Sequence, residues 1–204
     1  VIMPAPSTWQ AARGGAVSPD ARVPQVRVAF QGAPGAFSEE AALAHFGAGV
    51  ECVPCATFAD AGALLANGAA THGIFPLENA IAGPVHASLD VLARYGFGEV
   101  ARVSHPIRMF LLAIPGATLA EIRQVISHPV ALEQCGAFLR RLSNACATPF
   151  FDTAGAAREV ASRGIPTLAA ISPPATAARY CLRVLASDVH DRPDNVTHFA
   201  VVRA

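Results

Sequence analysis

The sequence predicts an α/β fold, and three observations support this. Short apolar runs of strand type alternate with segments of helical spacing from residue 26 onward in the 204-residue chain. The composition is 52 % hydrophobic and 15 % charged, which is typical of a globular protein and excludes a disordered one. Polar residues gather just beyond the apolar runs, where open α/β sheets bind ligands. The alternation predicts parallel strands joined by βαβ crossovers.

The first half of the chain contains three expected strands and three expected helices. The strands are expected at residues 26–30, 50–53 and 72–77, and the helices at 36–46, 57–66 and 84–95. Thr57 is a good N-cap for the second helix, with Asp60 in its first turn. Gly96 ends the third helix.

The second half repeats this pattern. Strands are expected at residues 100–103, 108–114, 124–127, 149–151, 168–171 and 196–202, and helices at 130–142, 153–163 and 174–182. Pro129 suits the first turn of a helix and Gly164 suits a helix end. No internal repeat is evident.

Residues 1–25 differ from the rest, because four prolines and a Gly-Gly pair interrupt them. They have no basic start followed by a continuous apolar core, so we expect a flexible N-terminal arm and no signal peptide. Met3 is a candidate initiator. No apolar run reaches the length of a membrane span.

The charge pattern limits the possible partners and chemistry. Fifteen basic and fifteen acidic residues give no net charge, which disfavours nucleic acid or an acidic membrane as the main partner. The chain contains no lysine, which excludes Schiff-base chemistry, lysine-anchored pyridoxal phosphate and a P-loop. An anionic ligand is therefore expected to bind Arg, His or backbone N–H groups.

The five cysteines include a C-x-x-C pair, Cys52 and Cys55. The pair has no second C-x-x-C or His-rich partner and does not open a helix after a strand. Metal sites need three or four converging ligands. We interpret the cysteines as reduced, buried, cytosolic thiols.

Two candidate site motifs lie in the first half. The loop from Gly32 to Ser38 joins a strand to a helix, where backbone N–H groups and Ser38 can bind an anion. A plain Gly/Pro turn is the alternative. Asn79 follows a strand and can orient a hydroxyl or carboxylate, or can form an Asx turn. Its neighbour Glu78 is a candidate ligand, although a surface or helix-cap carboxylate is the stronger interpretation.

Two further motifs follow expected strands in the second half. Ser127 is a candidate helix cap, and His128 is either a general acid or base or a structural histidine. Gln134 is placed to face a cleft. Asp152 is best interpreted as a helix N-cap, whereas Thr153 can donate to a ligand carboxylate.

The last strand contains Thr197 and His198, whose side chains are expected on opposite faces. Spacing alone does not make Thr197 catalytic. The chain has no nucleophile elbow, H-E-x-x-H, Walker A motif or complete G-x-G-x-x-G, which disfavours the commoner hydrolases, proteases, kinases and dinucleotide-binding enzymes.

Taken together and in order, these motifs resemble the prephenate dehydratase family from residue 26 to residue 202. The resemblance rests on short segments that include Gly32–Ser38, Pro76–Asn79, Leu89–Leu92, Ser127–Cys135, Asp152–Ala157, Ala169–Ile171 and Asn195–Phe199. Each segment is short, and their shared order makes the match specific.

The resemblance implies two α/β lobes of the periplasmic-binding-protein type II, with a substrate cleft between them. Lobe 1 is expected to comprise residues 26–105 and 187–204, and lobe 2 residues 106–186. The implied enzyme is a cytoplasmic hydro-lyase of phenylalanine biosynthesis that converts prephenate to phenylpyruvate, carbon dioxide and water. It needs no cofactor or metal, and a homodimer or higher homo-oligomer is expected.

The resemblance also implies roles for individual residues. Thr197 is the expected catalytic residue, acting on the leaving hydroxyl. The expected substrate-binding residues are Asn79, Glu78, Ser38, Ser127, Gln134, Thr153 and His198.

Three features depart from the family pattern. The family's Thr-Arg-Phe is Thr197-His198-Phe199 here, and its Glu-Asn-Ser ends in Ala80. These changes affect the expected rate and substrate choice more than the expected fold. The chain stops five residues after Phe199, so we expect neither a fused ACT domain nor feedback inhibition through one. No chorismate mutase segment is expected before the domain.

Three alternatives remain open on the sequence. An arogenate dehydratase would yield phenylalanine, and a diverged prephenate decarboxylase would yield a non-aromatic acid, although Thr197 disfavours the latter. A non-catalytic module that binds a small acid is the third, since fold does not fix function.

Overall fold

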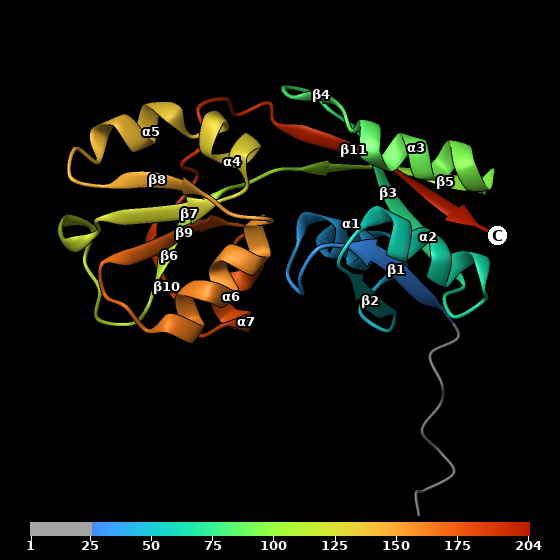
Figure 1. Cartoon of the computed structure of the whole chain (residues 1–204), viewed down its shortest axis with the longest axis horizontal. Coiled ribbons are helices and arrows are strands. Elements are labelled where there is room, and N and C mark those ends of the chain that lie inside the picture. The colour runs from blue at the N-terminus through green and yellow to red at the C-terminus, as the bar shows by residue number, and fades with distance from the viewer. Residues whose placement is uncertain (1–25) are drawn as a thin grey trace, which may run out of the picture.

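The computed structural model describes residues 26–204 and consists of two α/β lobes side by side (Figure 1). Each lobe is built on one mixed β-sheet with helices packed against it. The predicted α/β class with two lobes is therefore confirmed. The flexible arm predicted for residues 1–25 lies outside the described residues.

The first lobe contains a sheet in the order β2-β1-β3-β11-β5, with the short β4 paired to β3. Its elements are β1 (Arg27–Gln31), α1 (Phe37–Phe46), β2 (Glu51–Cys55), α2 (Phe58–Ala66), β3 (His72–Asn79), β4 (Gly83–Pro84), α3 (His86–Tyr95), β5 (Gly98–Pro106) and β11 (Val196–Arg203). Strands β1, β2 and β3 are parallel, and β11 runs antiparallel to both β3 and β5.

The second lobe contains a sheet in the order β10-β6-β9-β7-β8. Its elements are β6 (Phe110–Ala113), η1 (Leu119–Glu121), β7 (Gln124–Ser127), α4 (Pro129–Gln134), α5 (Gly136–Arg141), β8 (Cys146–Pro149), α6 (Thr153–Arg163), β9 (Leu168–Ser172), α7 (Ala175–Arg179) and β10 (Arg183–Ala186). Strands β7, β8 and β9 are parallel, whereas β6 and β10 are antiparallel to their neighbours.

The structure corrects the prediction at several elements. The sheets are mixed, because β11 enters the first sheet from the other lobe and therefore runs against β3. The helix expected at 130–142 is two helices, α4 and α5, because the backbone of Cys135 leaves the helical region. The strand expected at 149–151 lies earlier, as β8. Strand β10 was not predicted, since it is an edge strand of only four residues that follows a helical segment closely.

Helices cover both faces of the first sheet, and the strand residues alternate between them. On one face Val28, Phe30 and Phe199 pack in a core with α1. On the other face Ala29, Phe75 and Ala200 pack with α2 and α3. This period of two places neighbouring residues of β3 and β11 on opposite faces, which decides below which of them reach the cleft.

Two chain segments cross between the lobes, as expected of the periplasmic-binding-protein type. Residues 107–109 lead from β5 to β6, and residues 187–195 return from β10 to β11. The segments are hydrogen-bonded to each other, from Ile107 N to Asn195 O at 2.8 Å and from Val189 N to Met109 O at 2.8 Å. The return segment brings Asn195 and then Thr197 to the border between the lobes.

The five cysteines are all free, but not all are buried as predicted, because Cys146 and Cys181 are exposed. Cys52 and Cys55 lie on β2 and pack into the cores on opposite faces of the first sheet, so their sulfur atoms do not share a site. Burial raises the pKa of the Cys135 thiol to about 12. Within residues 26–204, no helix combines the length and apolarity needed to cross a membrane.

Candidate active site

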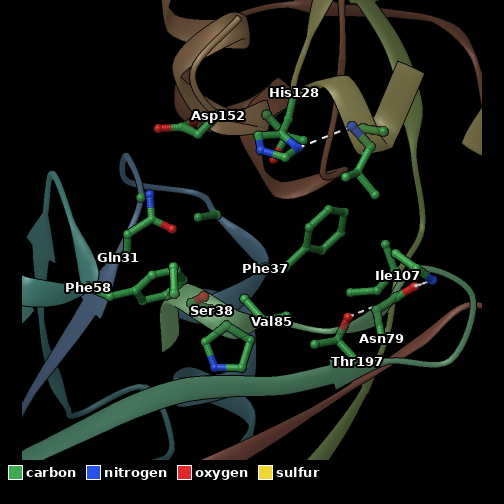
Figure 2. A pocket seen from close by; sticks show the side chains of 18 of the residues that line it. Gln31, Phe37, Ser38, Phe58, Asn79, Val85, Ile107, His128, Asp152 and Thr197 are labelled. Carbon is green, nitrogen blue, oxygen red and sulfur yellow. Dashed lines mark hydrogen bonds between the residues drawn. The ribbon is translucent and has the colours of Figure 1, made fainter. Parts of the chain in front are cut away.

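A cavity of about 660 Å³ lies between the lobes and is lined by residues of both. The first lobe lines it with the ends of β1 and β3, the start of β11 and the first turns of α1, α2 and α3. The second lobe lines it with the first turns of α4 and α6. Figure 2 shows His128 and Asp152 of the second lobe facing Ser38, Asn79 and Thr197 of the first. The cavity therefore occupies the position that sequence analysis predicted, beyond the carboxyl ends of the parallel strands.

Three amide side chains, which we call the amide ring, join the lobes at one end of this cavity. Asn79 Nδ2 donates to Asn195 Oδ1 at 2.7 Å, Asn195 Nδ2 donates to Gln134 Oε1 at 2.9 Å, and Gln134 Nε2 donates to Asn79 Oδ1 at 3.1 Å. Each amide donates to the next, so the ring closes, and the backbone N–H groups of Ile81 and Ala82, which donate to Asn79 Oδ1, fix its direction.

Asn79 is the centre of these contacts. Its Oδ1 also accepts from Ile81 N at 3.0 Å and from Ala82 N at 2.9 Å, which is the Asx turn considered as an alternative. Its Nδ2 also contacts Val196 O at 3.2 Å and Thr197 Oγ1 at 3.0 Å. The hydrogen-bonding capacity of this amide is therefore used within the protein.

The contact from Asn79 determines how the Thr197 hydroxyl is oriented. Thr197 lines the cavity, and its oxygen accepts the hydrogen bond from Asn79 Nδ2 (Figure 2). A hydroxyl carries a single hydrogen and can donate it once. Since Thr197 Oγ1 donates to no other residue in the described chain, its hydrogen is left for a ligand in the cavity.

The other end of the cavity contains two helix N-termini and the carboxylate of Asp152, which caps α6 by accepting from Gly155 N. Helices α1 and α6, of 10 and 11 residues, both begin in residues that line it. The N–H groups of a helix's first turn have no partner inside the helix and carry partial positive charge. Ser38 is 8 % exposed, lines the cavity and makes no side-chain hydrogen bond with any described residue. Thr153 also lines the cavity, in the first turn of α6.

A second set of contacts, which we call the loop clamp, joins the lobes beside this end of the cavity. It fixes the β1–α1 loop against the second lobe. Tyr180 Oη donates to Pro34 O at 2.6 Å, Arg179 pairs with Glu39 at 3.1 Å, and Ala33 N donates to Asp152 Oδ2 at 3.3 Å. The loop turns at Gly35, whose φ of +93° and close contact with Thr176 exclude a side chain.

His128 lines the cavity from the second lobe and behaves as a neutral cap. Its Nδ1 accepts from Val130 N at 3.3 Å, at the start of α4. Burial lowers the pKa of His128, and the negative charge of Asp152 only partly opposes this. The ring is therefore neutral near pH 7, with its proton on Nε2.

Of the eight predicted site residues, five line the cavity: Ser38, Asn79, Gln134, Thr153 and Thr197. The other three do not. Glu78 and His198 are cross-strand neighbours on β3 and β11, next to Asn79 and Thr197 but on the opposite face. His198 Nδ1 lies 2.8 Å from Ser104 Oγ. Ser127 is fully buried and donates to Ile171 O at 2.6 Å, which ties β7 to β9.

Sequence reasoning missed three residues that organise the site. Asn195 begins the segment Asn195–Phe199, and its polar side chain just before an apolar strand was an available signal. Glu39 and Arg179 are 140 positions apart, and no local pattern links them. No arginine is among the residues that line the cavity, and the described chain has no group of three His, Cys, Asp or Glu side chains suited to a metal ion.

These features define a two-lobed α/β protein whose cleft combines an oriented hydroxyl with helix ends that favour a small anion. The chain belongs to the prephenate dehydratase family, because the family model described as "Prephenate dehydratase" matches residues 28–204.

Individual relatives agree with this assignment. The chain is 36 % identical over 178 residues to arogenate dehydratase/prephenate dehydratase 2, chloroplastic, of Arabidopsis thaliana, covering 87 % of this chain and 46 % of that protein. It therefore spans less than half the length of that relative. A crystal structure of prephenate dehydratase from Arthrobacter aurescens in complex with L-Phe is 32 % identical, with a TM-score of 0.81, covering 87 % of this chain and 60 % of the other.

A third similar protein has a different described activity. The structure of GqqA, described as a novel type of quorum quenching acylase, is 34 % identical to this chain. Its TM-score is 0.77, and the match covers 87 % of this chain and 64 % of GqqA.

Proposed function

We propose that the chain catalyses the decarboxylating dehydration of prephenate to phenylpyruvate. The observation that carries this proposal is the orientation of Thr197, whose oxygen accepts from Asn79 and whose hydrogen is free for the cavity. The reaction needs such a donor, because the departing ring hydroxyl must gain a proton to leave as water. The amide ring holds this donor in place and is itself uncharged.

The steps of the reaction balance with one proton consumed. The bond between the ring and its carboxylate breaks and releases carbon dioxide, and the electron pair enters the ring. The bond to the ring hydroxyl then breaks, and Thr197 Oγ1 provides the proton that makes the leaving group water. The threonine recovers a proton from solvent. Because threonine is a weak acid, we attribute its effect mainly to positioning and to a hydrogen bond that strengthens as the oxygen departs.

The two carboxylates of prephenate fit the other end of the cavity. This chain has no lysine, and no arginine of residues 26–204 lines the cavity. The first turns of α1 and α6, with the hydroxyls of Ser38 and Thr153, are then the groups that bind the carboxylates. Asn79 and Gln134 act as positioning residues, since their amides are occupied within the amide ring.

The experiment that tests this function is product analysis with the purified protein. With prephenate, the wild type should form phenylpyruvate, and Thr197→Ala should lower kcat by about 100-fold or more with the fold intact by circular dichroism. Undiminished turnover by Thr197→Ala would refute the assigned role. Phenylalanine formed only from arogenate would identify an arogenate dehydratase. Tight prephenate binding without product would favour a binding module.

The acylase activity described for GqqA is less consistent with this site. An attacking threonine needs a base that accepts its proton. Here Thr197 Oγ1 accepts a hydrogen bond from Asn79, and no basic group of the described chain is hydrogen-bonded to it. The homo-oligomer and the cytoplasmic location stay predictions, and the Arabidopsis relative is described as chloroplastic.

A further inference from the structure

Glu39 places a negative charge next to the end of the cleft that should bind carboxylates. It lies in the first turn of α1, immediately after Ser38, and is 7 % exposed. Its Oε2 accepts from Gly35 N, so the carboxylate is held against the β1–α1 loop. Nothing in the proposed reaction uses this charge, and an anionic substrate bound at Ser38 would be repelled by it.

Arg179 is the residue that compensates for this charge. It reaches from α7 of the second lobe, and its Nη2 lies 3.1 Å from Glu39 Oε1. Arg179 does not line the cavity and so does not contact a ligand there. Arg179 acts on the ligand site through its ion pair with Glu39, and it does not bind the ligand itself.

A second observation marks the same end of the cavity as a ligand site. Ser38 is 8 % exposed as a residue and lines the cavity, and its hydroxyl has no hydrogen-bond partner among the described residues (Figure 2). The hydroxyl is open to the cavity and keeps its hydrogen-bonding capacity, so a ligand oxygen there can bind it. This ligand oxygen would lie one residue along the helix from Glu39.

We propose that Arg179 is a positioning residue that neutralises Glu39 and thereby allows a dicarboxylate to bind at the first turn of α1. The proposal rests on the proposed function, because it takes prephenate as the dicarboxylate. Charge, and not the docking of the loop alone, is the property that matters. The loop clamp supplies a matched control, since Tyr180, the residue after Arg179 at the end of α7, holds the same loop through an uncharged contact with Pro34 O.

The test measures steady-state formation of phenylpyruvate from prephenate by four variants and the wild type. Arg179→Gln leaves Glu39 unpaired and should raise KM about tenfold, with kcat changed less than about threefold, because carboxylate binding is shared by ground state and transition state. Adding Glu39→Gln to Arg179→Gln should return KM to within about threefold of wild type. Tyr180→Phe should change KM by less than about twofold.

Thermal denaturation will show whether Arg179→Gln folds. If it does not, the Glu39→Gln variant tests the proposal by itself. This variant removes the repelling charge and leaves Arg179 unpaired, so KM should fall about twofold to threefold. A raised KM in Glu39→Gln would contradict the proposal. Equal increases in KM for Arg179→Gln and Tyr180→Phe, with no recovery in the double variant, would also overturn it.

The two proposals fail in distinguishable ways. If the wild type converts prephenate and Arg179→Gln has the same KM, the role of Arg179 is wrong and the proposed function stands. If the wild type neither converts prephenate nor binds it in isothermal titration calorimetry, the proposed function is wrong, and the role of Arg179 fails with it.

Discussion

The lobes are joined on both sides of the cleft, and the two contacts have opposite chemistry. The amide ring of Asn79, Gln134 and Asn195 contains no charge, and each amide both donates and accepts. The loop clamp depends on an ion pair, a carboxylate and a phenol, bound to the β1–α1 loop. Hydrogen bonds between neutral groups therefore organise one side, and charged groups organise the other.

This difference matches what each end of the cleft must do. A hydroxyl that donates to a leaving group needs an oriented neighbour, and a carboxylate beside it would accept its hydrogen instead. A site for carboxylates needs a favourable local field, which a buried glutamate would cancel without a partner. If this is correct, variants in the amide ring should act through hydrogen-bond direction, and variants in the loop clamp should act through charge.

The largest effect is expected from Asn79→Asp, which keeps the shape of the side chain and replaces its Nδ2 donor by an oxygen. The contact with Thr197 is reversed, and the donations to Asn195 Oδ1 and Val196 O are lost. A carboxylate accepts from the Thr197 hydroxyl, so the hydrogen meant for the ligand turns away from the cavity. We expect kcat to fall about 100-fold or more, as for loss of the hydroxyl itself. The measurement is kcat with prephenate, and a kcat within threefold of wild type would break the account of the amide ring.

An intermediate effect is expected from Gln134→Leu. The variant removes the second lobe's contribution to the amide ring and leaves Asn195 Nδ2 without its acceptor. One unpaired buried donor costs about 1–3 kcal/mol, so we expect kcat/KM to fall roughly tenfold and the melting temperature to drop. Thermal denaturation and kinetics measure both, and unchanged values for both would show that the ring does not couple the lobes.

The smallest effect is expected from His128→Gln, which tests whether the His128 ring is uncharged in the folded protein. The pKa of His128 is lowered by burial, so the unfolded chain binds a proton more readily than the folded one. Stability contributed by the neutral ring is thus present above about pH 6.5 and is lost as pH falls below it.

The measurement for His128→Gln is melting temperature against pH. The wild type should lose stability more steeply than the variant below about pH 6.5, with the curves parallel above it. A variant with the steeper loss would mean that His128 is charged in the folded protein, and the division between a neutral and a charged side would need revision.

Much of the fold and part of the candidate site could be predicted from the sequence. Ser38, Asn79, Gln134, Thr153 and Thr197 were found because polar residues at strand ends and helix starts share one edge of an α/β sheet. Glu78 and His198 were included because they belong to the same motifs as Asn79 and Thr197, although the strand period turns them to the other face.

The features that the sequence did not predict are contacts between residues far apart in the chain. The pairing of Glu39 with Arg179 joins two lobes and leaves no local pattern. The closed amide ring needs three segments in register, from β3, α4 and the return to β11. The antiparallel course of β11 likewise follows from the chain's return through the second lobe, which an alternation of strands and helices does not reveal.

The most direct test of the central claim compares Thr197→Val with Thr197→Ser in prephenate turnover. Valine keeps the shape of threonine and removes the hydroxyl, whereas serine keeps the hydroxyl and removes a methyl group. The account predicts that the valine variant loses about 100-fold or more in kcat and that the serine variant stays within about tenfold of wild type. Equal kcat values for the two variants would contradict the claim that the oriented Thr197 hydroxyl performs the reaction.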